Sequence, residues 1–122
     1  ANGLKMLSRL YWYMVEFGLI ATPEGLRAYG SGILSSKSET VYSVESSKPN
    51  RIKFSLERVM LTDYLIDDFQ QTYFVIESFE QLFRAAYGTD FAPIYRKYRD
   101  VSGLAPNAVL VTDHIVPRTK EV

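Results

Sequence analysis

The stretch "RLYWYMVEFGL", residues 9–19, carries a helical pattern to a glycine and then into further apolar sequence. Apolar residues recur at helical spacing through this stretch and ahead of it, at Leu4, Leu7, Tyr11, Met14 and Val15. Gly18 follows at the position that a glycine takes just after a helix. The pattern therefore predicts a helix over about residues 4–17, with Glu16 in its last turn.

Glu16 is an unusual neighbour for the side chains around it. At 100° per residue it shares a helix face with Trp12, while the apolar stripe lies on another face, so two faces are apolar or aromatic. A negative charge in the last turn opposes the helix dipole, and Trp12, Val15 and Phe17 would desolvate it. Two interpretations follow: a surface carboxylate on the helix flank near Arg9, or a carboxylate whose charge a bound cation compensates.

The composition is that of a globular protein of one domain or part of one. Of its 122 residues, 47% are hydrophobic and 14% aromatic, which is enough for a core. Fourteen Lys plus Arg balance fourteen Asp plus Glu, which argues against nucleic acid or a membrane surface as a partner. The chain has no cysteine, no apolar run near the roughly 20 residues of a membrane span and no signal-peptide pattern. We expect a cytoplasmic protein.

Downstream, short elements follow one another. Local signals predict a turn or short helix in "ATPEGL", then a brief extended stretch before a glycine turn at Gly30 and Gly32, and then a capping box at Ser36 and Glu39. Further on they predict a helix begun by Ser55, a strand in "QTYFVIES", a helix over 79–87 opened by Ser78 and Gln81, and a helix within 91–99. Residues 102–122 show neither heptads nor helical periodicity and are expected to form an extended, partly loose tail. The fold class predicted is α+β, rich in helices, with short strands and irregular connections.

Few residues outside this helix suggest a catalytic or ligand-binding role. The only histidine, His114, lies in the tail, where an exposed side chain is a better expectation than a metal ligand. The sequence contains no recognisable catalytic triad and no phosphate loop, and "YGSG" indicates a turn. The nine Tyr and seven Phe fit a core and a pocket wall better than base stacking, because no basic surface accompanies them.

Three stretches in order, "RLYWYMVEFGL", "AYGSGILSSKSE" and "DDFQQTYFVIESF", resemble the aromatic amino acid hydroxylase family, most closely its bacterial phenylalanine 4-monooxygenases. The resemblance runs from about Leu7 to about Phe91 and covers the C-terminal part of that family's catalytic domain. It implies residues 1–101 as part of such a domain and 102–122 as a tail. Family members bind Fe(II) through two histidines and a glutamate, oxidise a tetrahydropterin and hydroxylate an aromatic ring with O2.

The resemblance also implies roles for individual residues. Glu16 matches the glutamate ligand of the iron, and Tyr11 matches a tyrosine close to the iron and the pterin. Trp12 and Phe17 match aromatic residues that line the substrate pocket. A further group would contact the substrate or brace a histidine ligand: Gly32, Ser35 and Glu39. Ile66 matches a position that is aliphatic in phenylalanine-specific members and acidic in tyrosine-specific ones, which favours L-phenylalanine as the substrate.

Without the resemblance, some of these residues have simpler interpretations. Gly32 and Ser35 would serve a turn and a cap, and Ile66 would pack in a core. The family's paired histidines, spaced His-x-x-x-x-His, lie upstream of the glutamate, as do most of the pterin loop and the arginine that binds the substrate carboxylate; none is present here. We therefore expect the chain alone to bind no iron and to be inactive.

Two hypotheses from different classes remain. In the first, the chain is a C-terminal fragment of a phenylalanine 4-monooxygenase of the monomeric bacterial type, which its start at Ala1 within a helical pattern would suit. Such a fragment would self-associate through the apolar surface that it leaves bare. In the second, the chain is a non-catalytic binding or interaction module that retains the wall of the substrate pocket.

Overall fold

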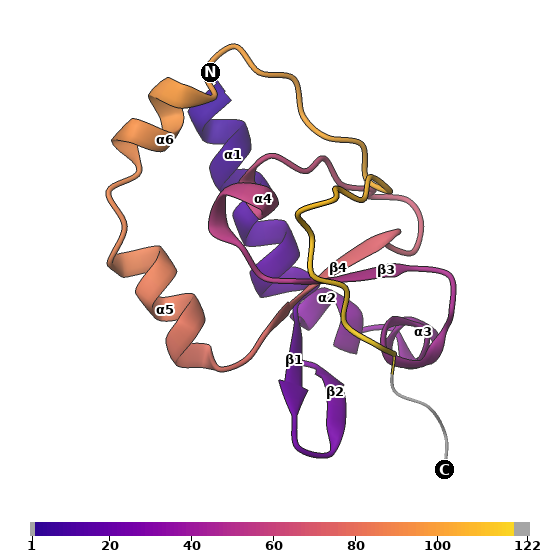
Figure 1. The fold of residues 1–122 in the computed structure, drawn as a ribbon. Helices are drawn as coiled ribbons and strands as arrows, with labels where there is room; N and C mark the ends of the chain where they lie inside the picture. Colours follow the sequence, from indigo (N-terminus) through magenta and orange to yellow (C-terminus); the bar gives the residue numbers. More distant parts are fainter. Residues whose placement is uncertain (1, 119–122) are drawn as a thin grey trace.

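The structure, a computed structural model, describes residues 2–118. Its elements are α1 (Asn2–Tyr11), η1 (Trp12–Glu16), β1 (Leu19–Thr22), β2 (Gly25–Ala28), α2 (Ser31–Leu34), α3 (Lys37–Glu45), β3 (Asn50–Lys53), α4 (Leu56–Met60), β4 (Thr72–Ile76), α5 (Phe79–Tyr87) and α6 (Ala92–Lys97). The strands form one mixed sheet in the order β2-β1-β4-β3 (Figure 1). The predicted α+β class, rich in helices and with short strands, is confirmed. No helix among the described residues is long and apolar enough to cross a membrane.

The predicted first helix exists, but its last turn is a π-helix rather than an α-helix. The Phe17 amide donates to the Trp12 carbonyl at 2.9 Å, a span of five residues instead of four. The wider turn brings the rings of Trp12 and Phe17 together, with centroids 4.8 Å apart. π turns of this kind occur often at functional sites.

The first helix buries one apolar side and exposes the other. Its buried side chains include Met6, Tyr13 and Met14. Much of the stripe found in the sequence is exposed instead, namely Leu4, Leu7, Tyr11 and Val15. Only Met14 belongs to both sets. A helix with two apolar sides can turn only one of them to the sheet, so the other remains on the surface.

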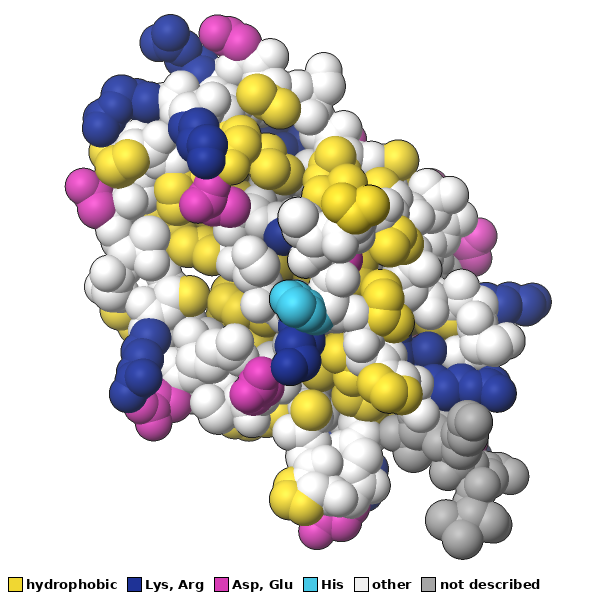
Figure 2. Space-filling view, viewed as in Figure 1, with side chains coloured by type: hydrophobic (Ala, Val, Ile, Leu, Met, Phe, Trp, Pro, Cys, Tyr) yellow, Lys and Arg dark blue, Asp and Glu magenta, His cyan; other side chains and the backbone are white. Residues whose placement is uncertain are grey.

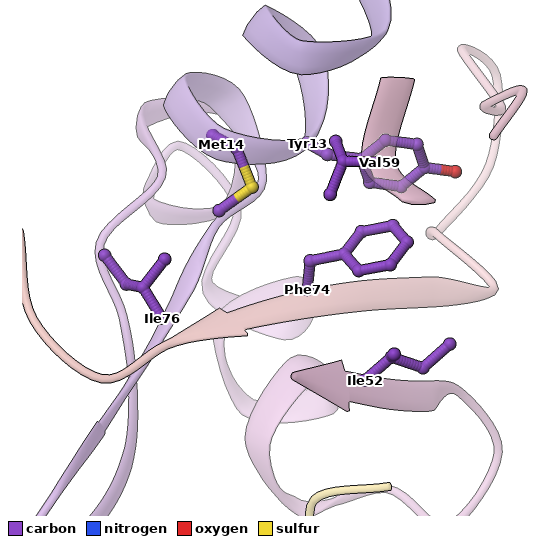
Figure 3. Packing of buried hydrophobic residues seen from close by; sticks show 6 residues of the cluster. All are labelled: Tyr13, Met14, Ile52, Val59, Phe74 and Ile76. Carbon is purple, nitrogen blue, oxygen red and sulfur yellow. The ribbon is translucent and has the colours of Figure 1, made fainter. Parts of the chain in front are cut away.

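Strand β4 lies at the centre of the packing, and all five of its residues are buried. Because side chains alternate along a strand, it supplies two cores. The core beside α1 and α4 contains Tyr13, Met14, Ile52, Val59, Phe74 and Ile76 (Figure 3). The core on the other face contains Leu19, Leu26, Ile33, Tyr73 and Val75, with Tyr42 and Val44 of α3 packed against it.

Two of the predicted turns, in "ATPEGL" and at the glycines that follow, lie in the segment after β1. "ATPEGL" forms a hairpin turn, in which the Thr22 hydroxyl accepts from the Glu24 amide at 3.2 Å and donates to the Gly25 carbonyl at 2.7 Å. Gly25 has φ 111°, a conformation that glycine adopts without strain. The glycine turn expected near Gly32 is wrong in part, because α2 begins there. Its first amide bond runs from Leu34 to the Gly30 carbonyl at 3.0 Å.

The predicted helix starts at Ser36 and Ser78 are confirmed, although each capping box is only half formed. The Ser36 hydroxyl accepts from the Glu39 amide at 3.2 Å, and the Ser78 hydroxyl accepts from the Gln81 amide at 3.1 Å. The acidic or amide side chain of each box does not return to the cap residue. That of Gln81 accepts from the Glu77 amide at 2.8 Å. The carboxylate of Glu39 accepts instead from the Tyr73 hydroxyl and the Gln70 amide.

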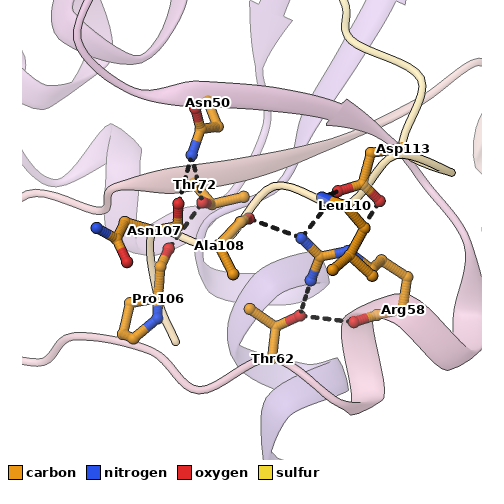
Figure 4. Close-up of polar contacts among 9 residues, drawn as sticks. All are labelled: Asn50, Arg58, Thr62, Thr72, Pro106, Asn107, Ala108, Leu110 and Asp113. Carbon is orange, nitrogen blue, oxygen red and sulfur yellow. Dashed lines mark hydrogen bonds and ion pairs between the residues drawn. The ribbon is translucent and has the colours of Figure 1, made fainter. Parts of the chain in front are cut away.

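The C-terminal segment is extended as predicted, and its described part, up to residue 118, is held in place. The Val116 amide donates to the Arg51 carbonyl at 2.8 Å, which sets this segment beside β3. Asp113, whose side chain is 3% exposed, accepts from the Arg58 guanidinium at 2.9 and 3.0 Å (Figure 4). Arg58 also donates to the Ala108 carbonyl at 2.8 Å. This polar cluster fastens the segment to α4, so the looseness expected of it is not found up to residue 118.

We predict that Asp113→Asn lowers the free energy of unfolding at pH 7 by about 3 kcal/mol, because it leaves the buried Arg58 without its counter-charge. Burial pushes the pKa of Asp113 upward, but the bonds from Arg58 and the Leu110 amide outweigh it and hold that pKa below the ordinary value of 3.8. A lowered carboxyl pKa stabilises the fold above 3.8, and this gain is lost as pH falls through the folded-state value. Urea unfolding from pH 7 to pH 2 measures the effect.

The matched control is Asp100→Asn, because the pair of Asp100 with Arg99 is exposed and 3.8 Å long. Its change should stay within about 0.5 kcal/mol at every pH. The difference between Asp113→Asn and the unsubstituted chain should shrink in acid. An equal difference at pH 7 and pH 2 would contradict the assignment.

Candidate functional site

The site forms where the end of the first helix meets the segment before α2. Glu16 is the last residue of η1 and is half-buried. The Gly18 carbonyl after it accepts from the amides of Tyr29 and Gly30 at 3.1 and 3.2 Å. Glu16, Phe17 and Gly32, which sequence reasoning placed in one site, are therefore brought together.

The two glycines before and within α2 make this contact possible. A Cβ on Gly30 would lie 2.4 Å from the Glu16 carbonyl oxygen. A Cβ on Gly32 would lie 2.8 Å from Cζ of Phe17 and 3.0 Å from the Glu16 carbonyl oxygen. Any side chain at either position would force this backbone apart. The close packing of this segment against Glu16 and Phe17 therefore requires glycine at both positions.

The other two residues of that segment lie at different depths. Ser35 is exposed, and its hydroxyl donates to the Gly32 carbonyl at 2.9 Å. Glu39 is only 6% exposed, and one carboxylate oxygen accepts from the Tyr73 hydroxyl at 2.5 Å and from the Gln70 amide at 3.2 Å. Burial, and then the bond to Glu39, raises the pKa of Tyr73, so the phenol stays protonated and acts as the donor. Glu39 thus joins α3 to the central strand.

Trp12 stands in an aromatic stack at the other side of η1. Its ring lies 4.5 Å from that of Tyr64, nearly parallel at 14°, and 4.8 Å from that of Phe17. The indole Nε1–H donates to Oε1 of Gln70 at 3.2 Å. The sequence predicted Trp12 and Phe17 as site residues but gave no sign of Tyr64 and Gln70. Both missed residues lie in the connection between α4 and β4, which has no periodicity to show which side chains turn inward.

A groove of about 670 Å³ runs beside this stack. Its walls come from the first helix, the connection before β4 and α5, and include Leu7, Tyr11, Trp12, Tyr64, Phe83 and Tyr87. Two of the predicted site residues, Tyr11 and Trp12, therefore face one hollow. Tyr11 is 56% exposed and Tyr87 is 86% exposed, so the groove is open to solvent.

Ile66 is placed apart from this groove. It is 73% exposed, which excludes the interpretation as a core residue. It lines a neighbouring hollow together with Leu4, Arg9 and Pro106, and Tyr64 borders both hollows. A direct contact between Ile66 and a substrate stays a prediction.

Among residues 2–118, no three or more His, Cys, Asp or Glu side chains are grouped so that they could hold a metal ion. The donor set around Glu16 is a single carboxylate, which does not by itself fit an iron ion. His114 lies exposed in the C-terminal segment, as expected, and its carbonyl accepts from the Lys53 amide at 2.8 Å (Figure 2). Figure 2 also shows basic and acidic side chains scattered over this face, with apolar side chains between them.

The chain that carries this glutamate and the glycine-containing segment packed against it matches one known class of protein. Residues 1–98 match the family model of the biopterin-dependent aromatic amino acid hydroxylases, and the chain belongs to that family. The resemblance found in the sequence is thereby confirmed.

Within this family the chain is similar to bacterial enzymes over most of its length. It is 62% identical over 99 residues to the phenylalanine-4-hydroxylase of Chromobacterium violaceum, covering 81% of this chain and 33% of that protein. It is 65% identical over 94 residues to that of Ralstonia nicotianae, covering 77% and 30%. The iron- and phenylalanine-bound crystal structure of the Chromobacterium violaceum enzyme superposes with a TM-score of 0.91 at 53% identity over 94% of this chain and 42% of that one. The chain thus spans about a third of the length of these relatives.

We predict that Gly32→Ala lowers the free energy of unfolding by about 1 to 3 kcal/mol, because its methyl group overlaps the Phe17 ring and the Glu16 carbonyl. Phe17 must then move relative to Trp12, which changes the fluorescence of this single tryptophan. The control is Gly3→Ala in α1, whose methyl group would meet Tyr95 at an ordinary 3.5 Å. It should stabilise the chain by up to about 1 kcal/mol. Equal effects at the two positions in urea titrations would contradict the packing argument.

Proposed function

We propose that this chain supplies the C-terminal part of an iron- and tetrahydropterin-dependent phenylalanine 4-monooxygenase, which converts L-phenylalanine to L-tyrosine with O2. The observation that carries the proposal is the turn at Glu16, packed against Gly30 and Gly32 and flanked by the aromatic stack of Trp12. The 62% identity to the Chromobacterium violaceum enzyme supports it. The same proposal includes a cytoplasmic location, a domain formed by residues 1–101 and a tail formed by residues 102–122.

In this proposal each residue of the chain has a physical task. Glu16 contributes one anionic oxygen ligand, and a bound metal would compensate the cost of holding its charge beside aromatic rings. The iron and the tetrahydropterin, when bound, supply the chemistry that activates O2. Trp12 and Phe17 offer apolar ring faces to the substrate's phenyl group. Tyr11, at the open edge of the groove, would stand close to the iron and the pterin.

The remaining site residues support this arrangement. Gly32 admits the close packing at Glu16, and Ser35 and Glu39 hold the segment that contacts the substrate or braces a histidine ligand. Ile66 presents an apolar side chain without an acceptor for a phenolic hydroxyl. An apolar contact rejects an added hydroxyl by about a hundredfold at most, so phenylalanine should be preferred over tyrosine by no more than that factor.

We expect the chain alone to be inactive, because a single carboxylate does not chelate iron. The exposed apolar stripe and the groove fit a surface that requires covering, as in the fragment hypothesis. The alternative, a non-catalytic module, would use the same groove to bind an apolar or aromatic ligand without any metal.

An experiment with a chimera distinguishes the enzyme fragment from the non-catalytic module. This chain replaces the matching third of the Chromobacterium violaceum enzyme, and tyrosine formation is measured with Fe(II), tetrahydrobiopterin and O2. The chimera should be active, and the 122-residue chain alone should form no tyrosine and should self-associate in sizing chromatography. A folded, iron-loaded chimera without activity would contradict the proposal. A monomeric chain that binds phenylalanine without metal would favour the module.

Loss of a residue that only supports a metal ligand weakens metal binding roughly 10- to 100-fold. We predict that Glu16→Gln in the chimera weakens iron binding by more than this, because Glu16 would be a ligand itself. The amide keeps the shape of the side chain but loses the charge that balances Fe(II), so the fold should be retained. Iron content per chain after reconstitution is the measurement. Glu24→Gln, at an exposed position in the hairpin turn, is the control and should retain full occupancy. Full occupancy and turnover in Glu16→Gln would remove it from the ligand set.

A further inference from the structure

Gln70 lies outside the predicted site and contacts two of its residues, Trp12 and Glu39. It is 1% exposed. Its backbone amide donates to Glu39 at 3.2 Å, its Nε2 donates to the Leu65 carbonyl at 2.8 Å, and its Oε1 accepts from the Trp12 indole at 3.2 Å. The side chain of Gln70 therefore joins Trp12 of the first helix to the connection before β4, and its backbone amide joins that connection to α3.

The direction of each bond is set by chemistry. A carbonyl only accepts, so the bond to Leu65 requires the NH2 group of Gln70 on that side. The oxygen of Gln70 then faces Trp12, whose indole nitrogen only donates. On the backbone side, Glu39 is itself held by the Tyr73 hydroxyl at 2.5 Å. The acceptor offered to Trp12 is thus fixed in both identity and position.

Trp12 needs such an acceptor to have one orientation. Its ring packs against the rings of Phe17 and Tyr64, at centroid distances of 4.8 and 4.5 Å. Stacking holds the plane of an aromatic ring but tolerates sliding and rotation within that plane. The bond from the indole nitrogen to Gln70 removes this freedom, since it has a preferred length and angle.

We propose that Gln70 is a positioning residue that fixes the indole of Trp12 in the wall of the aromatic substrate pocket. The proposal rests on the function proposed above, in which Trp12 faces the phenyl ring of phenylalanine. Gln70 does not touch the substrate in this assignment. Its loss should therefore weaken substrate binding through Trp12 and leave the chemical step nearly unchanged.

The first test observes Trp12 directly in the 122-residue chain, which has one tryptophan and hence one indole N–H resonance. Gln70→Met keeps the length of the side chain and removes the acceptor. We expect the indole proton to exchange with solvent about fivefold faster, the factor of one typical hydrogen bond, and its resonance to shift upfield. The control is Gln71→Met, since Gln71 is exposed and only its backbone is paired, with Asn50. It should change neither quantity. Unchanged exchange in Gln70→Met would overturn the proposal.

The second test uses the chimera, whose folding does not depend on the isolated chain. Gln70→Met should raise KM for phenylalanine about fivefold, again the factor of one typical hydrogen bond, and should leave kcat nearly unchanged. Trp12→Phe, which removes the indole N–H, should do the same, and the double variant should be no worse than either single one. Additive effects, or a fall in kcat at constant KM, would show that Gln70 acts only through the fold. An inactive chimera in which the indole test succeeds would reject the proposed function but keep the orienting role.

Discussion

The burial of every residue of β4 is the constraint on which the rest of the structure depends. A strand covered on both faces must place an apolar or fully paired side chain at each position. Phe74 packs against the first helix, and Tyr73 turns to the opposite face. The Tyr73 hydroxyl is buried there and finds its partner in Glu39, whose carboxylate is therefore buried too. One strand thus determines where the first helix and α3 lie relative to each other.

The site follows from that placement. β1 runs parallel to β4, with Leu19 paired to Val75. The first helix must therefore end before Leu19, where β1 begins. The turn at Glu16 occupies this short distance, and the π-helical bond of Phe17 shapes it. The segment before α2 returns along β2 and meets the same turn, where only glycine leaves enough room. The backbone of Glu16 is therefore held on both sides, a rigidity that would suit the metal ligand of the proposed function.

The surface of the first helix carries an apolar stripe that nothing in the described chain covers. Leu7, Tyr11 and Val15 are exposed on the first helix and continue the groove formed with α5. An exposed apolar stripe and the partly exposed carboxylate of Glu16 lie at neighbouring places on the first helix. Under the proposed function both are completed together, since the side that supplies the other iron ligands would also cover the stripe. Self-association through this stripe, when nothing covers it, is what the proposed function predicts.

The sequence by itself determined the elements whose signals are local. The caps at Ser36 and Ser78, the strand within "QTYFVIES" and the position of Glu16 at a helix end all follow from side chains a few residues apart. Only the tertiary structure decided which of two apolar helix faces meets the sheet, that the last turn is π-helical, and that Gln70 reaches Trp12 across 58 positions. Local periodicity cannot choose between two equally apolar faces, and an irregular connection such as that before β4 takes its shape from the contacts it makes. These outcomes depend on packing between distant segments, which no short stretch of sequence contains.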